Sequence, residues 1–300
     1  MSMLTRTEGA HPAPPTRSRR PGSSGRATVG AMVFMVLAAC YMLLPLYWLI
    51  VAATTNQGDL VSTHGLLGAE WQLGDNLVSL FTQQDGVFGR WLLNSLLYAG
   101  AGAAVATALA AAAGYALAKY TFPGRETVFS VDLGGVLVPA TALALPLFLL
   151  FAEFDATDTF WSVFLPSVVS PFGVYLSRIF AVASVPDEVI EAARMDGAGE
   201  FRIFRTLALR LMTPALVTVF LFQFVVIWNN FLLPLVMLQD DRLYPVTLGL
   251  FTWQSQTSRL PGLQSLTIVG ALVSVVPIVL TFLLLQRYWR AGLAAGAVKS

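Results

Sequence analysis

A short charged segment, residues 184–216, contains the side chains best suited to a specific contact with another molecule. Within it, Glu191 is followed directly by the small residues Ala192 and Ala193, and Gly197 comes soon after. A glutamate carboxylate can accept a charge-assisted hydrogen bond from a basic group, and small neighbours let that group come close. This pattern favours a surface that docks into a cleft of another protein.

Local signals around this segment predict a pair of short helices. Ser184 lies three residues before Asp187, and Pro186 with the acids Asp187 and Glu188 marks a helix amino terminus. Two glycines permit a sharp turn, and a second, amphipathic helix with basic side chains off its apolar stripe is expected to follow. The turn, the stripe and the basic side chains are Gly197, Gly199, Phe201, Phe204, Ala208, Leu211, Arg202 and Arg205. Such a hairpin could also lie among lipid headgroups without a protein partner.

The composition places this hairpin in a membrane protein. Of the 300 residues, 56% are hydrophobic and 12% are charged, far below the roughly 25% charged share of soluble domains. The formal net charge is only +1, from 18 basic and 17 acidic side chains, which excludes a bulk basic surface for nucleic acid. The bilayer is therefore the expected solvent.

Six stretches are long and apolar enough to cross the bilayer as helices of about 20 residues each. They cover about 27–58, 90–119, 127–152, 159–177, 210–240 and 266–287. The expected fold is an all-α integral membrane protein with six transmembrane helices, in which the two-helix hairpin lies between spans four and five. Three regions are expected: a disordered basic tail (1–26), a transmembrane domain (27–290) that includes the hairpin at about 184–213, and a second tail (291–300).

Basic residues predict the orientation, because short cytoplasmic loops carry the excess of Lys and Arg. With an inside amino terminus, the outer segments keep only Arg90, Arg242 and Arg259 as basic residues, and acids outnumber them there. The apolar run after the first tail exceeds the roughly 7 to 15 residues of a signal-peptide core, which favours a retained first helix. Both tails and the hairpin are therefore expected on the cytoplasmic side.

Few side chains could bind a metal ion or ATP. One cysteine, Cys40, and two histidines, His11 and His64, are too few for a disulfide, a thiolate cluster or the usual metal sites. A phosphate-binding loop of the GxxxxGK[ST] type needs a lysine directly after a glycine, and neither Lys119 nor Lys299 follows one. No cofactor is expected, and ATP that drives this protein would bind to another chain.

Two patterns inside the spans concern helix packing. Small residues recur at every fourth position of the second span, which favours the close approach of another helix over a substrate groove. Prolines permit kinks or breaks, which suit a transporter but are also tolerated in ordinary helix bundles. The small residues are Gly102, Ala106, Ala110 and Gly114, and the prolines include Pro45, Pro139, Pro146, Pro166, Pro171, Pro234 and Pro277.

The hairpin also resembles a known motif. The run Glu-Ala-Ala at 191–193, then Gly197 and the hydrophobic Leu207 and Leu209, is similar to the EAA loop of permease subunits in bacterial binding-protein-dependent ABC importers. One position departs from that pattern, since Arg210 stands where the family has proline. The exit from the second short helix is therefore expected to differ.

The resemblance extends over nearly the whole chain after residue 27, and its motifs are specific in combination. They are similar to the carbohydrate branch of these importers, in particular to the second, smaller permease of maltose-type systems. The matching pieces are WLLNSL (91–96), GYALAKYTFPGR (114–125), PLFLLF (146–151), EAARMDGAGEFRIF (191–204), WNNFLLPL (228–235) and GLAAGAVKS (292–300).

The resemblance implies a multi-pass permease of the bacterial cytoplasmic membrane that forms a sugar pathway with a second homologous permease. The implied partners are an ATP-binding-cassette ATPase dimer, an extracytoplasmic sugar-binding protein and membrane lipid. The hairpin would couple to the ATPase, and the C-terminal tail would contact the ATPase dimer. The implied coupling residues are Glu191, Ala192, Ala193, Asp196, Gly197 and Arg202, and the tail residues are Gly296, Val298 and Lys299.

Polar residues within the spans have two possible roles. Gln223, Asn229 and Asn230 should face protein or an aqueous path, because unpaired amides in hydrocarbon are costly, and Trp228 beside them can stack on a sugar face. Hydrogen bonding between helices explains the same residues equally well. Asp132 lies near the inner boundary of the third span, which favours an interfacial carboxylate over a proton site.

Two other function classes have less support. An ion-coupled secondary transporter of a small polar solute would work alone and usually shows internal repeats with midplane carboxylates, neither of which the sequence contains. An intramembrane enzyme would need a nucleophile beside a base, yet both histidines lie outside the predicted spans and Cys40 has no charged neighbour.

Overall fold

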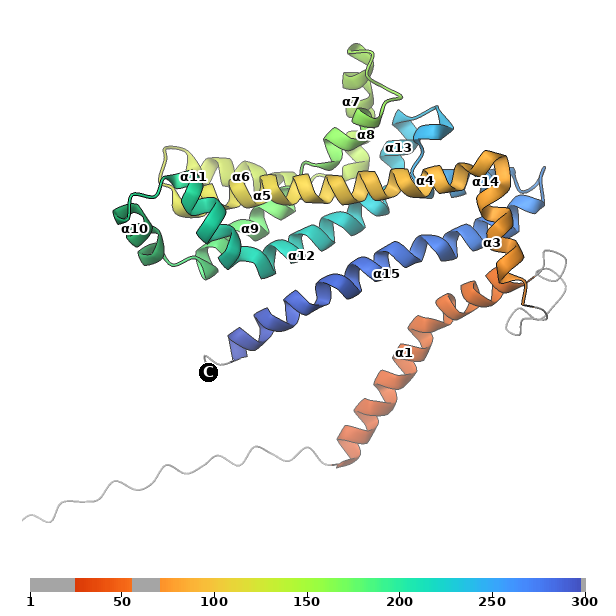
Figure 1. Ribbon diagram of the computed structural model, residues 1–300, viewed down its shortest axis with the longest axis horizontal. Helices are drawn as coiled ribbons and strands as arrows, with labels where there is room; N and C mark the ends of the chain where they lie inside the picture. Colours follow the sequence, from red (N-terminus) through yellow and green to blue (C-terminus); the bar gives the residue numbers. More distant parts are fainter. Residues whose placement is uncertain (1–24, 56–70, 298–300) are drawn as a thin grey trace, which may run out of the picture. The chain divides into compact units, whose positions relative to one another are not determined.

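The computed structural model describes residues 25–55 and 71–297, and the regular elements within those ranges are all helical (Figure 1). The boundary between two compact units falls within the first helix, after Trp48. Most of the tail predicted over residues 1–26 lies outside the described residues.

Helix α1 (Gly25–Thr54) corresponds to the predicted first span. Its apolar part, Val29–Thr54, is long enough to cross a bilayer. Large apolar side chains such as Phe34 and Tyr41 are mostly exposed. An extended apolar surface of this kind marks contact with lipid or with another apolar partner.

Five helices of the described residues are long and apolar enough to span a membrane, and a bent pair gives a sixth span if it is counted as one. The bent pair is α6 (Arg125–Val136) and α7 (Ala140–Glu153), which differ in direction by 102°. Pro139 lies at the break, and a proline disfavours the α region for the residue that precedes it. The predicted third span is therefore sharply broken.

A long helical stretch forms the predicted second span. This stretch begins with α3 (Leu73–Thr82), before the predicted start of the span at residue 90, and the chain then bends at η1 (Gln83–Gly86), where three consecutive residues have positive φ. Beyond the bend, α4 (Val87–Leu96), one π-helical turn η2 (Leu97–Ala101) and α5 (Gly102–Lys119) form one continuous helix. Figure 1 shows α4 and α5 in nearly straight continuation.

The fourth span also has a break, between α8 (Phe160–Ser167) and α9 (Pro171–Ser184). The Oγ of Ser170 accepts a hydrogen bond of 3.2 Å from the backbone N–H of Gly173 and caps α9, and Pro171 occupies the first helical position. Helix α9 continues to Ser184, past the predicted end of this span at Ser177.

The hairpin and the fifth span are one connected unit. Helix α10 (Asp187–Met195) is followed by α11 (Glu200–Ile203), a π-helical stretch η3 (Phe204–Ala208) and α12 (Leu209–Trp228), and the last three run on as one membrane-length helix. The prediction of a separate second short helix was therefore wrong. The helix continues through Arg210 and also through Pro214, which lies inside α12.

The remaining elements follow the fifth span. The chain continues through α13 (Leu232–Met237), η4 (Asp241–Leu243), α14 (Val246–Gln256) and α15 (Gly262–Ala297). Helix α15 includes the predicted sixth span and continues through most of the segment predicted as a C-terminal tail.

The small residues of α5 are buried, as the packing interpretation predicts. A Cβ atom on Gly114 would lie 2.6 Å from the backbone nitrogen of Arg178, and one on Gly102 would lie 2.9 Å from Cδ1 of Ile227. These glycines let α5 approach α9 and α12 closely. The stripe is therefore used for helix packing.

Two apolar clusters stabilise this arrangement. The larger contains Trp91, Tyr98, Trp228 and Trp253 and joins α4, α12 and α14. The smaller lies beneath the hairpin and joins its helices to the ends of α5 and α9. Its buried members are Tyr115, Ala181, Val185, Ile190, Ile203, Ala208 and Met212.

Candidate functional site

The turn of the hairpin is a helix C-cap that requires one glycine. The N–H of Gly197 donates to the carbonyl of Arg194, and the N–H of Ala198 donates to the carbonyl of Ala193, both at 3.0 Å. With φ at +78°, Gly197 adopts the left-handed conformation that completes a Schellman motif. The predicted turn is confirmed at Gly197, whereas Gly199 has an ordinary φ of −72°.

The start of α10 differs from the prediction. Pro186 is the residue before the helix, no side chain caps it, and Ser184 is instead the last residue of α9. Val185 between them is extended, as expected for a residue that precedes proline. The acids Asp187 and Glu188 do occupy the first turn of α10, where they interact favourably with the helix dipole.

One side of α10 packs against the rest of the protein through Ile190, which is 3% exposed. It belongs to the smaller apolar cluster with Ile203, which is fully buried, and Ala193 packs against the edge of the same cluster. Burial of such a side chain contributes roughly 1.5–3 kcal/mol. The apolar side of α10 therefore contacts protein, which argues against a helix that only lies among headgroups. The i, i+3 spacing of Ile190 and Ala193 was the available sequence signal.

Two residues at the end of α5 hold the start of α10 and the start of α11. The Nζ of Lys119 lies 2.7 Å from Oδ1 of Asp187, and the Tyr120 hydroxyl donates a 2.9 Å hydrogen bond to Oε2 of Glu200. Arg194 donates to both oxygens of Glu200, at 2.6 and 3.2 Å. The contacts of Tyr120 and Arg194 with Glu200 fix the hairpin at its turn, and the Lys119–Asp187 ion pair fixes its beginning. Sequence reasoning missed all three.

The charges at the turn shift the protonation of their neighbours. Burial, together with the adjacent Glu200 carboxylate, raises the pKa of Tyr120 to about 12. The hydrogen bond to Glu200 raises the pKa of Arg194. At neutral pH the Tyr120 hydroxyl therefore stays protonated and donates a hydrogen bond to Glu200, while Arg194 stays charged.

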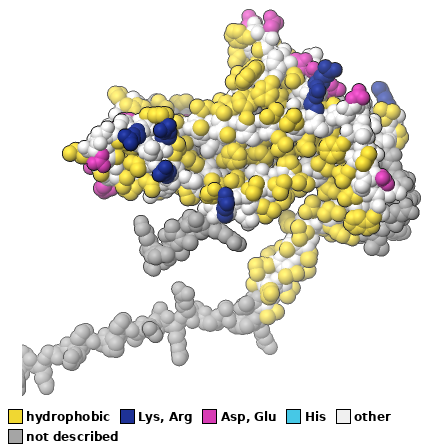
Figure 2. Space-filling model, in the orientation of Figure 1, with side chains coloured by type: hydrophobic (Ala, Val, Ile, Leu, Met, Phe, Trp, Pro, Cys, Tyr) yellow, Lys and Arg dark blue, Asp and Glu magenta, His cyan; other side chains and the backbone are white. Residues whose placement is uncertain are grey.

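Most of the predicted coupling residues are exposed on the hairpin. Glu191, Ala192, Asp196 and Gly197 are exposed and Ala193 is half-buried. No described residue forms an ion pair with Glu191, so its carboxylate is available to a partner. Figure 2 shows basic and acidic side chains close to each other at the end of the molecule that carries α10 and α11. Arg202 on α11 is also exposed.

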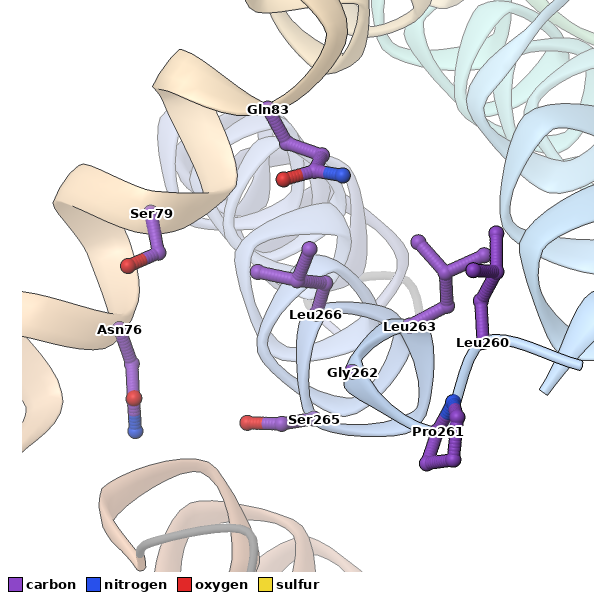
Figure 3. A pocket seen from close by; sticks show the side chains of 9 residues that line it. All are labelled: Asn76, Ser79, Gln83, Leu260, Pro261, Gly262, Leu263, Ser265 and Leu266. Carbon is purple, nitrogen blue, oxygen red and sulfur yellow. The ribbon is translucent and has the colours of Figure 1, made fainter.

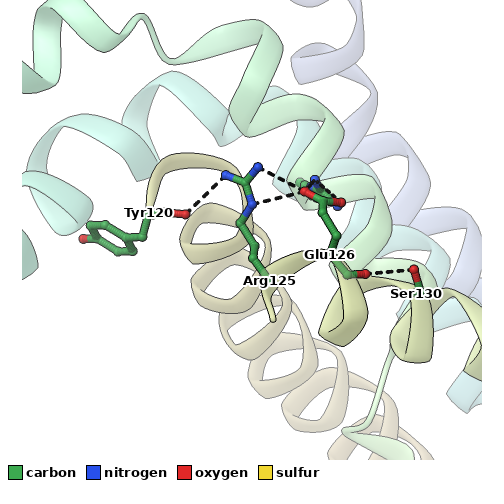
Figure 4. A network of polar contacts seen from close by, with 5 residues as sticks. Tyr120, Arg125, Glu126 and Ser130 are labelled. Carbon is green, nitrogen blue, oxygen red and sulfur yellow. Dashed lines mark hydrogen bonds and ion pairs between the residues drawn. The ribbon is translucent and has the colours of Figure 1, made fainter. Parts of the chain in front are cut away.

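A second polar network lies beside the hairpin, where α6 begins (Figure 4). The guanidinium of Arg178 on α9 donates to both carboxylate oxygens of Glu126, at 2.8 and 3.1 Å, and lies 3.8 Å from the ring centroid of Phe129. Arg125 donates to the carbonyl of Tyr120 at 3.3 Å. These contacts hold α6 against α9 and fix the chain just after α5.

The structure separates the predicted pathway residues into different roles. Gln223 accepts from the Ser170 hydroxyl and donates to the Ser167 carbonyl, both at 2.9 Å, so it bridges α12 to the break between α8 and α9. Trp228 is 2% exposed and its ring stacks on Phe224 at 5.6 Å, within the larger cluster. For Gln223, hydrogen bonding between helices is therefore the interpretation that the contacts favour.

Asn229 and Asn230 lie just after the end of α12. The Asn229 amide donates to the Val225 carbonyl at 2.8 Å, and the Asn230 carbonyl accepts from the Thr247 hydroxyl at 3.0 Å. Asn229 is exposed and Asn230 half-buried. Of the predicted pathway residues, these two remain accessible to a solute. Asp132 is half-buried on α6, with one carboxylate oxygen that has no partner among the described residues.

The C-terminal tail, the other segment predicted to contact the ATPase, lies partly outside the described residues. Gly296 lies at the end of α15, and Val298 and Lys299 lie outside the described residues. Within the described ranges, no group of three or more His, Cys, Asp or Glu side chains could hold a metal ion.

A pocket of about 450 Å³ lies far from the hairpin, between α3 and the start of α15. Figure 3 shows Asn76, Ser79 and Gln83 facing Ser265 across it, with leucine side chains beside them. The lining carries amide and hydroxyl groups but no charge, which suits a neutral solute. Because its residues come from segments far apart in sequence, no local pattern indicated it.

Comparison with known proteins assigns this arrangement to a family. Residues 113–293, which include the hairpin, match the model described as "Binding-protein-dependent transport system inner membrane component". The arabinooligosaccharides transport system permease protein AraQ of Halalkalibacterium halodurans is 35% identical over 225 residues, 75% of this chain and 79% of that protein. AraQ of Bacillus subtilis is 31% identical over 270 residues, 89% of this chain and 94% of that protein.

Other relatives and a solved structure agree. The lactose transport system permease protein LacG of Rhizobium radiobacter is 30% identical over 263 residues, 88% of this chain and 93% of that protein. A chain in the crystal structure of a bacterial ABC transporter involved in the import of the acidic polysaccharide alginate superposes with a TM-score of 0.76 at 19% identity, covering 90% of this chain and all of that one. The structural match supports the fold. With more than half of its length matched to the family model, the chain belongs to the family of binding-protein-dependent transport system inner membrane components.

Proposed function

We propose that this chain is one of two homologous permease subunits of a bacterial ABC importer for a carbohydrate. A separate ATPase dimer hydrolyses ATP, and an extracytoplasmic binding protein delivers the sugar. The observation that carries the proposal is the hairpin, whose inner side is packed and ion-paired while Glu191 points outward without a partner among the described residues. The family match and the names of the relatives, which concern arabinooligosaccharides and lactose, support the substrate class.

The hairpin suits a coupling contact because it is rigid and exposed at once. A basic side chain of the ATPase pairs with Glu191, and the small Ala192 lets the partner surface approach the helix. Asp196 and Gly197 form the exposed turn, and Arg202 adds a positive charge at its far side. ATP-driven closure of the ATPase dimer then moves α10 as a rigid body, and the permease alternates its access.

The orientation follows from the same surface. The hairpin and the basic side chains at its end of the molecule in Figure 2 face the cytoplasm, as do both termini. The C-terminal residues Gly296, Val298 and Lys299 contact the ATPase dimer. The protein is a multi-pass component of the cytoplasmic membrane and needs no cofactor of its own.

The sugar path involves the end of the fifth span. Asn229 and Asn230 lie where α12 ends, accessible and with amide groups that can bond to sugar hydroxyls. Trp228 supports this site from the apolar cluster, and its packed ring would reach a sugar only after the helices move. Gln223 holds the helices together.

The test is reconstitution of the complete importer in proteoliposomes. The chain is combined with its ATPase, second permease and binding protein, and uptake of radiolabelled arabinooligosaccharides and lactose is measured. We expect uptake of a sugar that requires both ATP and the binding protein and is unaffected by a protonophore. An ATPase whose nucleotide site is inactivated provides the matched control. Uptake by this chain alone, driven by an ion gradient, would instead establish the secondary transporter.

A further inference from the structure

The continuous helix formed by α4, η2 and α5, residues 87–119, connects two sets of contacts that lie far apart. At about 1.5 Å per residue its length is on the order of 50 Å, more than the hydrocarbon core of a bilayer. The residues at both junctions of the π-helical turn η2 have right-handed helical φ and ψ, so the helix continues through this turn. Such a helix moves as a rigid element.

At its inner end, the helix holds the hairpin through Lys119 and Tyr120. Lys119 is only 7% exposed and pairs with Asp187 in the first turn of α10. Tyr120 bonds to Glu200 just after the turn. The first turn of α10 is therefore tied directly to Lys119, and its last turn is tied to Tyr120 through Arg194 and Glu200.

At its outer end, the same helix holds the backbone of residues 241–246, which run from η4 to the start of α14. Trp91 Nε1 donates to the Asp241 carbonyl at 2.7 Å, and the Asn94 amide donates to the carbonyls of Arg242 and Tyr244 at 2.8 and 3.0 Å. The Tyr98 hydroxyl donates to the Leu243 carbonyl at 3.2 Å, and the Ser95 hydroxyl accepts from the backbone N–H of Val246 at 2.8 Å.

These outer contacts are specific in shape as well as in polarity. A Cβ atom on Gly249 would lie 2.2 Å from the Trp91 ring, so only glycine fits there. The four side chains that hold the segment recur along α4 and η2 at positions 91, 94, 95 and 98, which is one helix face. The segment therefore follows any axial shift or rotation of the helix.

We propose that this helix transmits movement of the cytoplasmic hairpin to the outer segment 241–246, with Lys119 and Tyr120 as the positioning residues at its inner end. The inference rests on the proposed function, since the ATPase supplies the movement. It adds a route by which ATP binding reaches the opposite side of the membrane. The route depends on two polar contacts at one end and five hydrogen bonds at the other.

The experiment places a reporter at the outer end and changes the inner end. Cys40 is the only cysteine, so Cys40→Ser gives a background for a single fluorophore at Arg242→Cys, where the side chain is exposed. The complete importer is assembled in nanodiscs, and the fluorescence change on adding ATP with vanadate is recorded. Lys119→Met and Tyr120→Phe are introduced singly and together. Tyr175→Phe is the matched control, because its ring only stacks on Phe129.

Each single variant should reduce the reporter change and the sugar transported per ATP by about threefold to tenfold, the size of one charge-assisted hydrogen bond that is partly exposed. The double variant should lose more, whereas Lys119→Arg and Tyr175→Phe should match the parent. ATP hydrolysis and co-purification should persist in all of them. A reporter change of parental size in the assembled double variant would overturn the proposal.

Two further outcomes are distinguishable. If the double variant does not assemble, the comparison of Tyr120→Phe with Tyr175→Phe decides, because each removes only one hydroxyl group. Equal reporter changes in those two variants would again contradict transmission through Tyr120. If the parent importer itself shows no ATP-dependent uptake, the proposed function fails, whatever the inner variants do.

Discussion

Lys119 and Asp187 form an ion pair of 2.7 Å across 68 positions of sequence, and it joins the end of α5 to the first turn of α10. The partners differ in exposure, since the side chain of Lys119 is 7% exposed and that of Asp187 is 76% exposed. Solvent screens the exposed carboxylate, so the pair itself stabilises the fold by no more than about 1 kcal/mol. Its role is to fix the position of α10 on α5.

The unequal exposure predicts unequal effects of two substitutions. Asp187→Asn leaves the enclosed Lys119 ammonium without its counter-charge, whereas Lys119→Met replaces the cation by an apolar side chain of similar length. We expect Asp187→Asn to lower the melting temperature of the purified permease at least as much as Lys119→Met. Thermal unfolding of both variants in one detergent checks this. A loss only in Lys119→Met would show that Asp187 contributes nothing to the hairpin.

A second prediction concerns the charge of Glu191. Because no described residue pairs with it, Glu191→Lys should leave the permease folded but repel the basic group of its partner. We expect sugar uptake to fall at least about tenfold, the scale of a lost charge-assisted contact. Uptake, ATP hydrolysis and co-purification of the ATPase are measured in the same membranes. Glu191→Gln, which keeps the shape, should lose less; unchanged uptake in Glu191→Lys with a stable complex would disprove the contact.

The topology gives a third prediction, tested by single cysteines in the Cys40→Ser background. Asp75→Cys and Asp241→Cys should react with a membrane-impermeant maleimide in intact cells. Met195→Cys, at a residue that is 88% exposed on the hairpin, should react only after permeabilisation, as should Lys299→Cys. Labelling of Met195→Cys from outside would reverse the assignment of the cytoplasmic face.

The pathway residues give a fourth prediction, because their environments differ. Trp228→Ala removes a buried ring and should cost about 3–5 kcal/mol, so assembly should suffer. Asn230→Ala keeps the backbone carbonyl that bonds to Thr247, so assembly should persist while sugar uptake weakens. Measurements of sugar uptake and of co-purification of the ATPase distinguish the two variants. Normal uptake in Asn230→Ala would remove that amide from the sugar path.

Local patterns were sufficient to predict some of these features. Hydropathy located the apolar spans, because a membrane helix must be apolar along its own length. The turn at Gly197 was predictable, since a left-handed C-cap depends on a single residue type. The stripe of small residues on α5 was also read correctly, because its four-residue period alone places those side chains on one face.

Other features depend on which segments meet in space. Nothing near Tyr120 indicates that it bonds to Glu200, 80 positions later. The burial of Trp228 depends on the helices that surround it. The continuation of α11 into α12 was missed because an amphipathic period shows that a helix exists but not where it ends. The break at Pro139 was foreseen only as a possibility, since Pro146, Pro214 and Pro277 lie inside helices that continue.

The last prediction isolates backbone conformation from packing at the hairpin turn. A Cβ atom at Gly197 or at Gly199 would meet no atom within 4 Å, so neither position is restricted by space. Their φ angles differ: +78° at Gly197 and −72° at Gly199. Positive φ is strongly disfavoured for a β-branched residue, whereas any L-residue can adopt the φ of Gly199.

Gly197→Val should therefore strain the turn by about 1–2 kcal/mol and displace Glu191 from its partner, whereas Gly199→Val should be nearly neutral. The expected result is sugar uptake reduced several-fold in Gly197→Val, with ATP hydrolysis no longer matched to transport and the transmembrane helices intact. Uptake, ATPase activity and co-purification of the ATPase are compared for the two variants at equal expression. Because the two valines differ only in the φ that they must adopt, equal uptake in both would show that the turn conformation has no part in coupling.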